Sequence, residues 1–361
     1  MFPIKNRIVF ESNPSFSGNS YALFKEMQQR NISASYQLFW ISNGEEPPIN
    51  DKNINIIDIS RKDFRNLCRY YWFMATSKII IYENRPLDKL NQKQIMISLQ
   101  HGTPIKQVAD IKMVGYGYDY VLCTSNNLNP ILSEVLHVRE ESLINLGFPR
   151  NDYLFKEDSE ILKSLKEKMV IWLPTFRQHK NKTLATDKSY PLGIPLINNE
   201  NDLLKLDNIL KKLNIKLVIK PHPAQDMTYL NIKSLNNFKV INDDVLKKNG
   251  MHLYELIGKS SALITDYSSV YFDYLLLNRP IAFTNDDIQL YKQGFVFEDI
   301  TEVLKGTSLS DLNDLLIFLE EVNSGNDEFL KEREIIKNWS HDNLDDSSSK
   351  RIADFIEKLI H

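Results

Sequence analysis

Cysteine is scarce in this 361-residue chain, which holds only Cys68 and Cys123. The two residues form no CxxC pair and no HExxH motif is present, which argues against a disulfide scaffold and a protein-bound zinc ion. No run of about 18 uninterrupted apolar residues occurs, so no membrane-spanning helix is expected. The N-terminal MFPIKNRIVFES lacks the long apolar stretch and small-residue cleavage site of a signal peptide. These absences predict a cytoplasmic protein with reduced cysteines.

The chain also lacks a large excess of positive or of negative charge. The chain has 44 Lys and Arg against 47 Asp and Glu, a net charge of −3, which gives no argument for a nucleic-acid partner. Apolar residues make up 42% and charged residues 25%, as in ordinary globular proteins. Because 361 residues exceed one ordinary hydrophobic core, two domains are expected.

Short apolar segments alternate with helical patterns, which predicts an α/β fold with doubly wound parallel sheets. Eleven such segments favour two sheets over one. The polar stretch 156–168, KEDSEILKSLKEK, precedes a fresh series of strands. We therefore expect domains over 1–155 and 156–345, followed by a capped amphipathic helix over 346–361. The expected strands cover 7–10, 35–40, 78–81, 94–98, 120–123, 143–146, 169–173, 216–220, 238–241, 262–265 and 281–283.

Ligands of open parallel sheets bind beyond the carboxyl ends of the strands, and polar residues follow several of the expected strands. In SLQHGTPIKQV, His101 follows a strand directly and Gly102 permits a sharp turn, with Lys106 as a nearby cation. A histidine placed there suits a general base or a phosphate ligand. The alternative is a histidine that only caps a loop.

Two later strand ends carry cations. In WLPTFRQHK, Arg177 offers the planar, fork-shaped guanidinium that suits phosphate. In VIKPHP, Lys220 precedes His222, whose backbone is restricted by the prolines on both sides. Such a rigid presentation favours a functional histidine.

A fourth strand end, in ALITDYSSVYFDYLLLNRP, places five polar or hydroxyl-bearing residues, 265–269, between a strand and a helix. They either cap the helix or bind phosphate at its N-terminus. We expect Asp266 to orient a neighbour, because a bare carboxylate repels phosphate. Together the four ends predict a phosphate pocket that lacks the GxGxxG and GxxxxGK[ST] fingerprints of dinucleotide and P-loop sites.

The ordered motifs HGTPIK, GFPRNDYL, LPTFR, KPHP, TDYSSVYFDY and NRPIAF resemble those of the CDP-glycerol glycerophosphotransferases, the teichoic acid primases and polymerases, over roughly residues 5–355. The resemblance implies two Rossmann-like domains in a GT-B-like arrangement, with the active site in the cleft between them. It also implies transfer of a polyol phosphate, glycerol phosphate first, from a CDP-activated donor to a hydroxyl of an undecaprenyl-linked glycan or polymer. CMP would be released, in the synthesis of teichoic acid or a capsule-type polymer.

The resemblance also implies roles for individual residues. His101 matches the motif histidine proposed as the catalytic base, and His222 matches a second essential histidine near the donor phosphates. The donor phosphates or nucleotide would contact Arg177, Lys220, Thr265, Ser268 and Ser269. Acceptor or supporting positions are Gly102, Thr103, Lys106, Arg150, Asp152 and Asp266.

No cofactor beyond the CDP-polyol donor is predicted, and no metal site. Asn285-Asp286-Asp287 is interpreted as a polar turn rather than a Mg²⁺ site, and Mg²⁺ dependence stays open. The segment 61–78, RKDFRNLCRYYWFMATSK, mixes cations with aromatic residues. Through Arg65, Arg69 and Trp72 it would bind the inner face of an anionic bacterial membrane peripherally. The alternative is an amphipathic helix that packs its aromatic residues inward.

Two other classes of function fit the same architecture. One is a nucleotide-sugar glycosyltransferase or an epimerase-like enzyme, and the other is a non-catalytic protein that binds a nucleotide-linked metabolite. The released nucleotide separates these classes, since only the phosphotransferase forms CMP from a CDP-polyol.

Overall fold

The computed structural model describes most of the chain and divides it into two compact units. Unit 1 comprises Met1–Thr103, Asp110–Asp152 and Trp339–His361, and unit 2 comprises Pro104–Ala109 and Tyr153–Asn338. The chain thus enters unit 2 briefly after residue 103 and returns to unit 1 at residue 339, so that the C-terminal helix lies within unit 1. The described residues are 3–30, 32, 35–48, 54–61, 63–84, 89–107, 118–156, 162–163, 166–175, 190–222, 235–284, 288 and 294–360.

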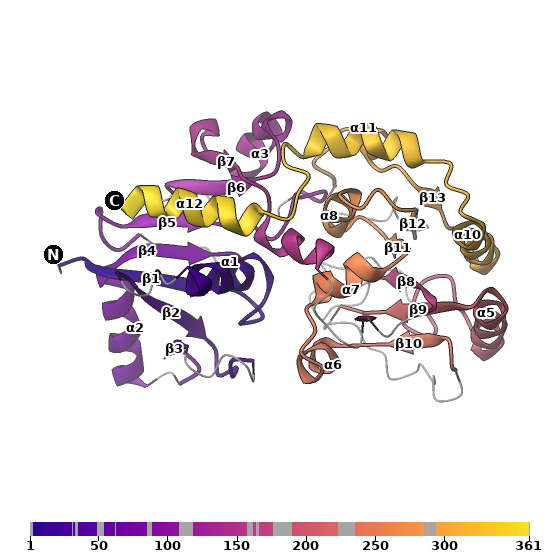
Figure 1. The fold of residues 1–361 in the computed structure, drawn as a ribbon, viewed down its shortest axis with the longest axis horizontal. Helices are drawn as coiled ribbons and strands as arrows, with labels where there is room; N and C mark the ends of the chain where they lie inside the picture. The colour runs from indigo at the N-terminus through magenta and orange to yellow at the C-terminus, as the bar shows by residue number, and fades with distance from the viewer. Residues whose placement is uncertain are drawn as a thin grey trace. The chain divides into compact units, whose positions relative to one another are not determined.

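Unit 1 is built on a parallel sheet with the strand order β3-β2-β1-β4-β5-β6-β7 (Figure 1). Its longer helices are α1 (Gly18–Gln29), α2 (Phe64–Thr76), α3 (Asn129–Leu136) and α12 (Ser348–Ile360). Two 3₁₀ turns cover Asn126–Leu128 and Glu140–Ser142, and a third, Pro149–Phe155, continues into unit 2 at Tyr153. The strands are β1 (Lys5–Glu11), β2 (Gln37–Ser42), β3 (Asn55–Asp58), β4 (Ser77–Tyr82), β5 (Ile95–Ser98), β6 (Tyr120–Cys123) and β7 (Leu143–Asn145).

Alternate residues of these strands form two separate cores, one on each face of the sheet. Phe10 and Trp40 pack with α1 and with Ile352 of α12. Val9 and the adjacent positions of the neighbouring strands pack instead with Phe73 of α2. Helices therefore cover both faces, as a doubly wound sheet requires.

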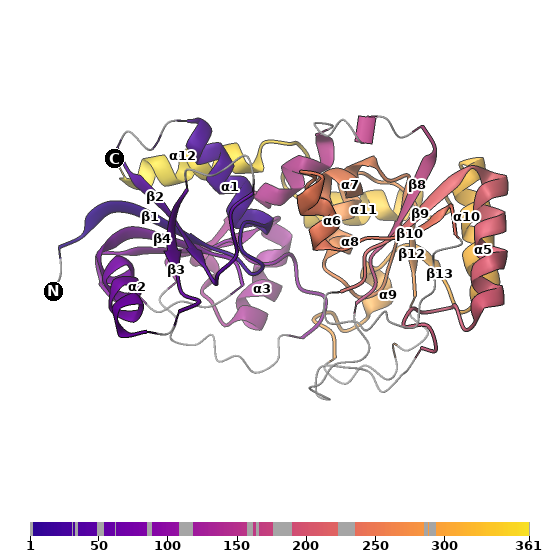
Figure 2. The same cartoon turned by 90° about the horizontal axis from the view of Figure 1, so that it is seen from below.

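Unit 2 is also built on a parallel sheet with helices, here with six strands in the order β10-β9-β8-β11-β12-β13. Figure 2 shows this sheet and its helices from a second direction. Its strands are β8 (Lys168–Trp172), β9 (Ile215–Ile219), β10 (Phe238–Val240), β11 (Ala262–Thr265), β12 (Ile281–Phe283) and β13 (Thr307–Ser308). Its helices are α5 (Glu200–Leu213), α6 (Asp243–Lys248), α7 (Leu253–Lys259), α8 (Val270–Leu275), α9 (Ile300–Val303), α10 (Leu312–Ser324) and α11 (Leu330–Ser340).

The predicted α/β class with two doubly wound parallel sheets is confirmed. All eleven expected strands are present, most with ends displaced by one or two residues. The sequence analysis missed β3 and β13, each of which lies at the edge of its sheet. Edge strands are covered less fully, so they need no continuous apolar run.

Each sheet has one point at which the strand order reverses direction. In unit 1 the chain runs outward from β1 through β2 to β3 and then resumes on the other side at β4. In unit 2 the corresponding neighbours are β8 and β11. Loops diverge at such a switch point and leave a crevice at the carboxyl ends of the two strands, which is where ligands bind in this class of sheet.

Both cysteines are free thiols. Cys68 is exposed on α2, whereas Cys123 is buried at the end of β6, where burial raises the pKa of its thiol to about 11. Within the described ranges, no helix combines the length and the apolar character needed to cross a membrane.

Candidate active site

His101 lies at the carboxyl end of the unit 1 sheet, where β5 ends and the backbone turns sharply. The residues on both sides have left-handed backbone conformations, with φ of 55° at Gln100 and 107° at Gly102. Such a conformation is unfavourable for a residue with a side chain, so the neighbouring structure must hold it. The Nδ2 group of Asn19 does so, donating to the carbonyl oxygens of Leu99 at 3.2 Å and Gln100 at 2.8 Å.

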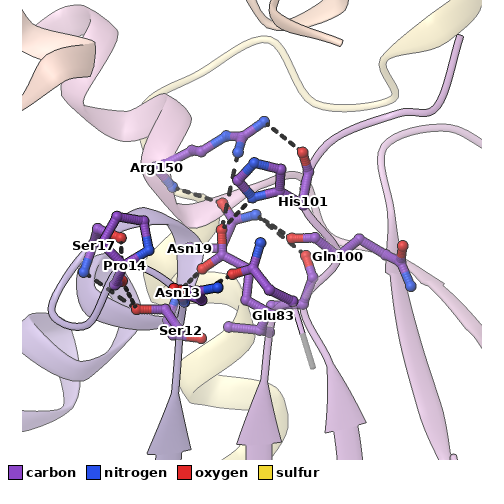
Figure 3. A network of polar contacts seen from close by, with 12 residues as sticks. Ser12, Asn13, Pro14, Ser17, Asn19, Glu83, Gln100, His101 and Arg150 are labelled. Carbon is purple, nitrogen blue, oxygen red and sulfur yellow. Dashed lines mark hydrogen bonds and ion pairs between the residues drawn. The ribbon is translucent and has the colours of Figure 1, made fainter. Parts of the chain in front are cut away.

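The side chain of His101 is 64% exposed, and its Nδ1 atom lies 3.3 Å from Oε1 of Glu83. Glu83 follows β4 directly, at the switch point beside β1, and only 1% of its side chain is exposed. Arg150 is also buried, with Nη1 3.9 Å from Glu83 Oε1 and Nη2 donating to the His101 carbonyl oxygen at 3.3 Å. Figure 3 shows the imidazole and the guanidinium on the same carboxylate.

The turn after β1 completes this end of the sheet. Ser12 Oγ donates to the Pro14 carbonyl oxygen at 2.7 Å (Figure 3). The Asn13 N–H donates to Asn84 Oδ1 at 3.0 Å. A cavity of about 130 Å³ opens here, rich in carboxylate, amide and hydroxyl groups that suit a hydroxylated molecule. It is lined by Glu11, Ser12, Asn13, Ser15, Ile41, Asn43, Glu45 and Ile59.

Asp152, expected at an acceptor or supporting position, binds the N-terminus of α12. Its two carboxylate oxygens accept the N–H groups of Ser348 and Ser349, each at 2.8 Å, and Asp152 is 3% exposed. A carboxylate at a helix N-terminus satisfies N–H groups that have no partner within the helix. Asp152 therefore anchors the last helix of the chain on unit 1 in this structure.

At the switch point of unit 2, Asp266 follows β11 and is fully buried. Its Oδ2 accepts both the backbone N–H and the hydroxyl of Thr175, each at 2.8 Å. The Thr265 hydroxyl donates to the Leu173 carbonyl oxygen at 2.9 Å. These bonds attach the residues after β8 to the end of β11, so Asp266 orients a neighbour, and Thr265 uses its hydroxyl within the fold.

Ser268 and Ser269 are half-buried between β11 and α8. Ser269 occupies the N-cap position of α8 but makes no side-chain capping hydrogen bond. Of the two interpretations of this segment, capping by Ser269 therefore has no supporting contact. Arg177, expected to share the phosphates with these serines, lies outside the described residues.

Lys106 belongs to unit 2, unlike His101 five residues earlier. It forms an antiparallel bridge with Phe295, and its Nζ lies 5.9 Å from the centre of the Tyr267 ring. Thr103, the last residue of unit 1 in this segment, is buried. The motif HGTPIK is thus shared between the units, with the histidine in one and the lysine in the other.

Lys220 and His222 follow β9. The Lys220 ammonium lies 3.1 Å from Asp243 Oδ1, in an ion pair whose lysine side chain is only 10% exposed. His222 is exposed. In the part of the chain that the structure describes, no group of three or more side chains could hold a metal ion, and residues 285–287 lie outside that part.

The sequence analysis missed Glu83 and Asn19. Glu83 stands directly after the apolar strand SKIIIY. Polar residues that follow a strand are candidates for a ligand site, so the reasoning that selected His101 applies equally to Glu83. Asn19 gave no signal, because its bonds to the 99–100 backbone join residues 80 positions apart.

Comparison with known proteins identified one matching family model. Residues 2–358 match the model for CDP-glycerol:poly(glycerophosphate) glycerophosphotransferase. The teichoic acid glycerol-phosphate primase of Bacillus subtilis (strain 168) is 25% identical, with 96% of this chain and 91% of the primase aligned. The teichoic acid poly(glycerol phosphate) polymerase of Bacillus spizizenii is 28% identical, over 81% of this chain and 77% of that protein.

Solved structures agree at the level of the fold. The wall teichoic acid polymerase TagF superimposes with a TM-score of 0.75 at 23% identity, covering 99% of this chain and 90% of that chain. A structure from Listeria monocytogenes, to which UDP-N-acetylglucosamine 2-epimerase activity is provisionally assigned, superimposes with a TM-score of 0.54 at 12% identity. The superposition covers 99% of this chain and 97% of that chain. The same fold therefore accompanies more than one reaction.

Proposed function

The chain belongs to the CDP-glycerol:poly(glycerophosphate) glycerophosphotransferase family, and from this premise we propose that it transfers glycerol phosphate from CDP-glycerol to a hydroxyl of a lipid-linked teichoic-acid-type acceptor. The match over residues 2–358 carries the proposal, because it spans both units. Two of its relatives are named as a teichoic acid glycerol-phosphate primase and a teichoic acid poly(glycerol phosphate) polymerase, and one TagF structure was obtained after a CDPG soak.

In the proposed reaction an acceptor hydroxyl oxygen attacks the phosphorus that carries the glycerol. A new P–O bond forms, the bond between that phosphorus and the bridging oxygen breaks, and CMP leaves. His101 takes the proton of the attacking hydroxyl through Nε2, and its exposed side chain supports this role. The polar cavity after β1 supports binding of a hydroxylated acceptor on the same unit.

Charge on the donor phosphates is neutralised, in this proposal, by Arg177, His222 and the hydroxyls of Ser268 and Ser269. The half-buried positions of Ser268 and Ser269, directly after β11 at the unit 2 switch point, support this assignment, because ligands bind at such a point. Lys106, whose Nζ lies 5.9 Å from the centre of the Tyr267 ring, adds a cation near the segment 265–269. Lys220 contributes only if it leaves Asp243.

The nucleotide that is released tests the proposed function directly. Purified protein is incubated with CDP-glycerol, CDP-ribitol or a UDP-sugar, each with a lipid-linked disaccharide acceptor, and the products are separated by chromatography. We expect CMP from CDP-glycerol, in amounts equal to the glycerol phosphate added to the acceptor. UDP from a UDP-sugar, with no CMP from either CDP-polyol, would replace the proposal by a glycosyltransferase of the same fold.

Membrane attachment through α2 is a second part of the proposal. Two adjacent stripes at i, i+4, i+7 spacing run along this helix, Phe64-Cys68-Tyr71 and Arg65-Arg69-Trp72, and together they define the basic–aromatic face of α2. Phe64 is 79%, Tyr71 52% and Trp72 37% exposed, so inward packing holds for Phe73 but not for these residues. Lys5 is exposed, and its Nζ lies 4.7 Å from the centre of the Trp72 ring, which adds a cation at the same face.

Reversing two charges on this face tests the attachment. We expect Arg65→Glu with Arg69→Glu to weaken binding to phosphatidylglycerol vesicles at least about 30-fold, because each basic residue near an anionic surface contributes about 1 kcal/mol. Lys211→Glu with Lys212→Glu, on the exposed end of α5, is the matched control and should bind normally. Equal vesicle flotation of both variants would remove α2 from the proposal.

A further inference from the structure

Glu83 is a buried carboxylate in contact with an exposed histidine, and such a charge is retained only when neighbouring groups compensate it. Oε2 accepts the Ser20 N–H at 3.0 Å, in the first turn of α1, where the helix dipole favours negative charge. Oε1 faces His101 Nδ1 at 3.3 Å and Arg150 Nη1 at 3.9 Å. The two oxygens thus meet a backbone donor on one side and the imidazole and guanidinium on the other.

The first residue of α1 is a glycine that leaves room for this carboxylate. A Cβ built on Gly18 would overlap both carboxylate oxygens of Glu83, and the residue also has a φ of +66°. Any side chain at position 18 would push the carboxylate away from Ser20 and His101. The packing at the start of α1 therefore fits Glu83 in the position that contacts the imidazole.

We propose that Glu83 is the positioning residue of the base: it holds the proton of neutral His101 on Nδ1, so that Nε2 keeps the lone pair that accepts the proton of the acceptor hydroxyl. This inference rests on the proposed function for the identity of the reaction. A carboxylate only accepts hydrogen bonds, so the imidazole nitrogen beside it must donate. The same arrangement selects the tautomer of the histidine in Ser-His-Asp hydrolases.

The backbone around His101 is held by other groups, which separates positioning of the ring from folding of the loop. Asn19 binds the carbonyl oxygens of residues 99 and 100, and Arg150 binds that of His101. None of these three bonds uses the Glu83 carboxylate. Replacing that carboxylate should therefore change which ring nitrogen of His101 carries the proton, while the backbone of the loop stays in place.

Glu83→Gln is the first test. An amide has one oxygen where the carboxylate has two, so it cannot accept from both Ser20 and His101, and the Nδ1 tautomer loses its support. We expect kcat with CDP-glycerol to fall about 10²-fold or more while KM for the donor changes less than about threefold.

The second readout does not require turnover. In ¹⁵N spectra of the protein at high pH, compared with a His101→Asn sample for assignment, the wild-type imidazole should show a protonated Nδ1 and an unprotonated Nε2. In Glu83→Gln the Nε2-protonated form should appear. If the wild-type ring carries its proton on Nε2, or if neither the ring nor kcat changes in the variant, the inference is wrong. A tautomer change in a protein that is inactive with CDP-glycerol would uphold the positioning and reject the function.

Gly18→Ala offers an independent route that leaves Glu83 in the chain. We expect it to lower kcat in the same way, because the new Cβ displaces the carboxylate. Gly250→Ala is the matched control: Gly250 has a similar φ of +60°, but a Cβ there meets no atom within 4 Å. Equal kcat in the two alanine variants would contradict a role for the carboxylate position.

Discussion

Replacing His101 by asparagine is expected to lower kcat with CDP-glycerol by about 10²- to 10⁴-fold while the protein still binds the donor. Asparagine fills part of the space but has no group that accepts a proton at neutral pH. The expected loss is the usual contribution of one general base, and the electrostatic groups around the phosphates would account for the rest. Rapid-quench measurement of CMP formation, with donor binding by calorimetry, separates the two quantities.

Folding should be little affected by this substitution, because the His101 side chain is 64% exposed and leaves no buried cavity when it is shortened. His137→Asn is a matched control in the same unit. His137 is also exposed and ends α3 with a φ of 52°, a conformation that asparagine tolerates. A His101→Asn protein whose kcat stays within about threefold of the wild type would remove His101 as the base.

Removing the Asp327 carboxylate is expected to destabilise unit 2 by about 3–5 kcal/mol, the largest effect on folding that we predict. Arg333 on α11 is completely buried, and its Nη1 donates to Asp327 Oδ1 at 2.9 Å while Nη2 pairs with Oδ2. In Asp327→Ala the guanidinium loses this partner and stays in a site with little water. Urea unfolding with hydrogen exchange of unit 2 amides would measure the change.

Unit 1 contains a natural control, an arginine–aspartate pair with the same sequence separation but with an exposed carboxylate. Arg351 and Asp345 are also six residues apart and also form two bonds, at 2.6 and 2.9 Å, but the Asp345 side chain is 56% exposed. Asp345→Ala should therefore lower the free energy of unfolding by no more than about 1 kcal/mol. Equal losses in the two variants would mean that burial of Arg333 does not determine the stability of its pair.

The apolar strands were the part of the fold that could be predicted best. Segments such as 79–81 and 262–264 are buried on both faces, so nearly every residue is apolar and the pattern is visible locally. The edge strands β3 and β13 could not be found in this way, because their exposed sides carry polar residues. The residues after the strands were also predictable as a group, since the carboxyl ends of parallel strands meet at one edge.

Partners of polar side chains were much harder to predict. Lys220 follows a strand as a phosphate ligand would, yet its ammonium pairs with Asp243. Asp152 lies within a motif of the family, yet it holds the N-terminus of a helix almost 200 residues later in the chain. The sequence identifies the chemical group of a charged residue, but its partner depends on which loops lie next to each other in the folded protein.

The sequence by itself determined the two doubly wound sheets, the polar strand ends and the family. These follow from apolar periodicity, which acts over a few residues, and from ordered motifs, which stand in the chain regardless of its folding. Only the tertiary structure decided which polar residues touch. Glu83 and His101 are 18 positions apart, and Asn19 and Arg150, which are 131 positions apart, both donate to carbonyl oxygens of the same turn. Their contact arises because the switch point brings β1, β4 and β5 to one edge, and hydrogen bonds depend on distance in space rather than along the chain.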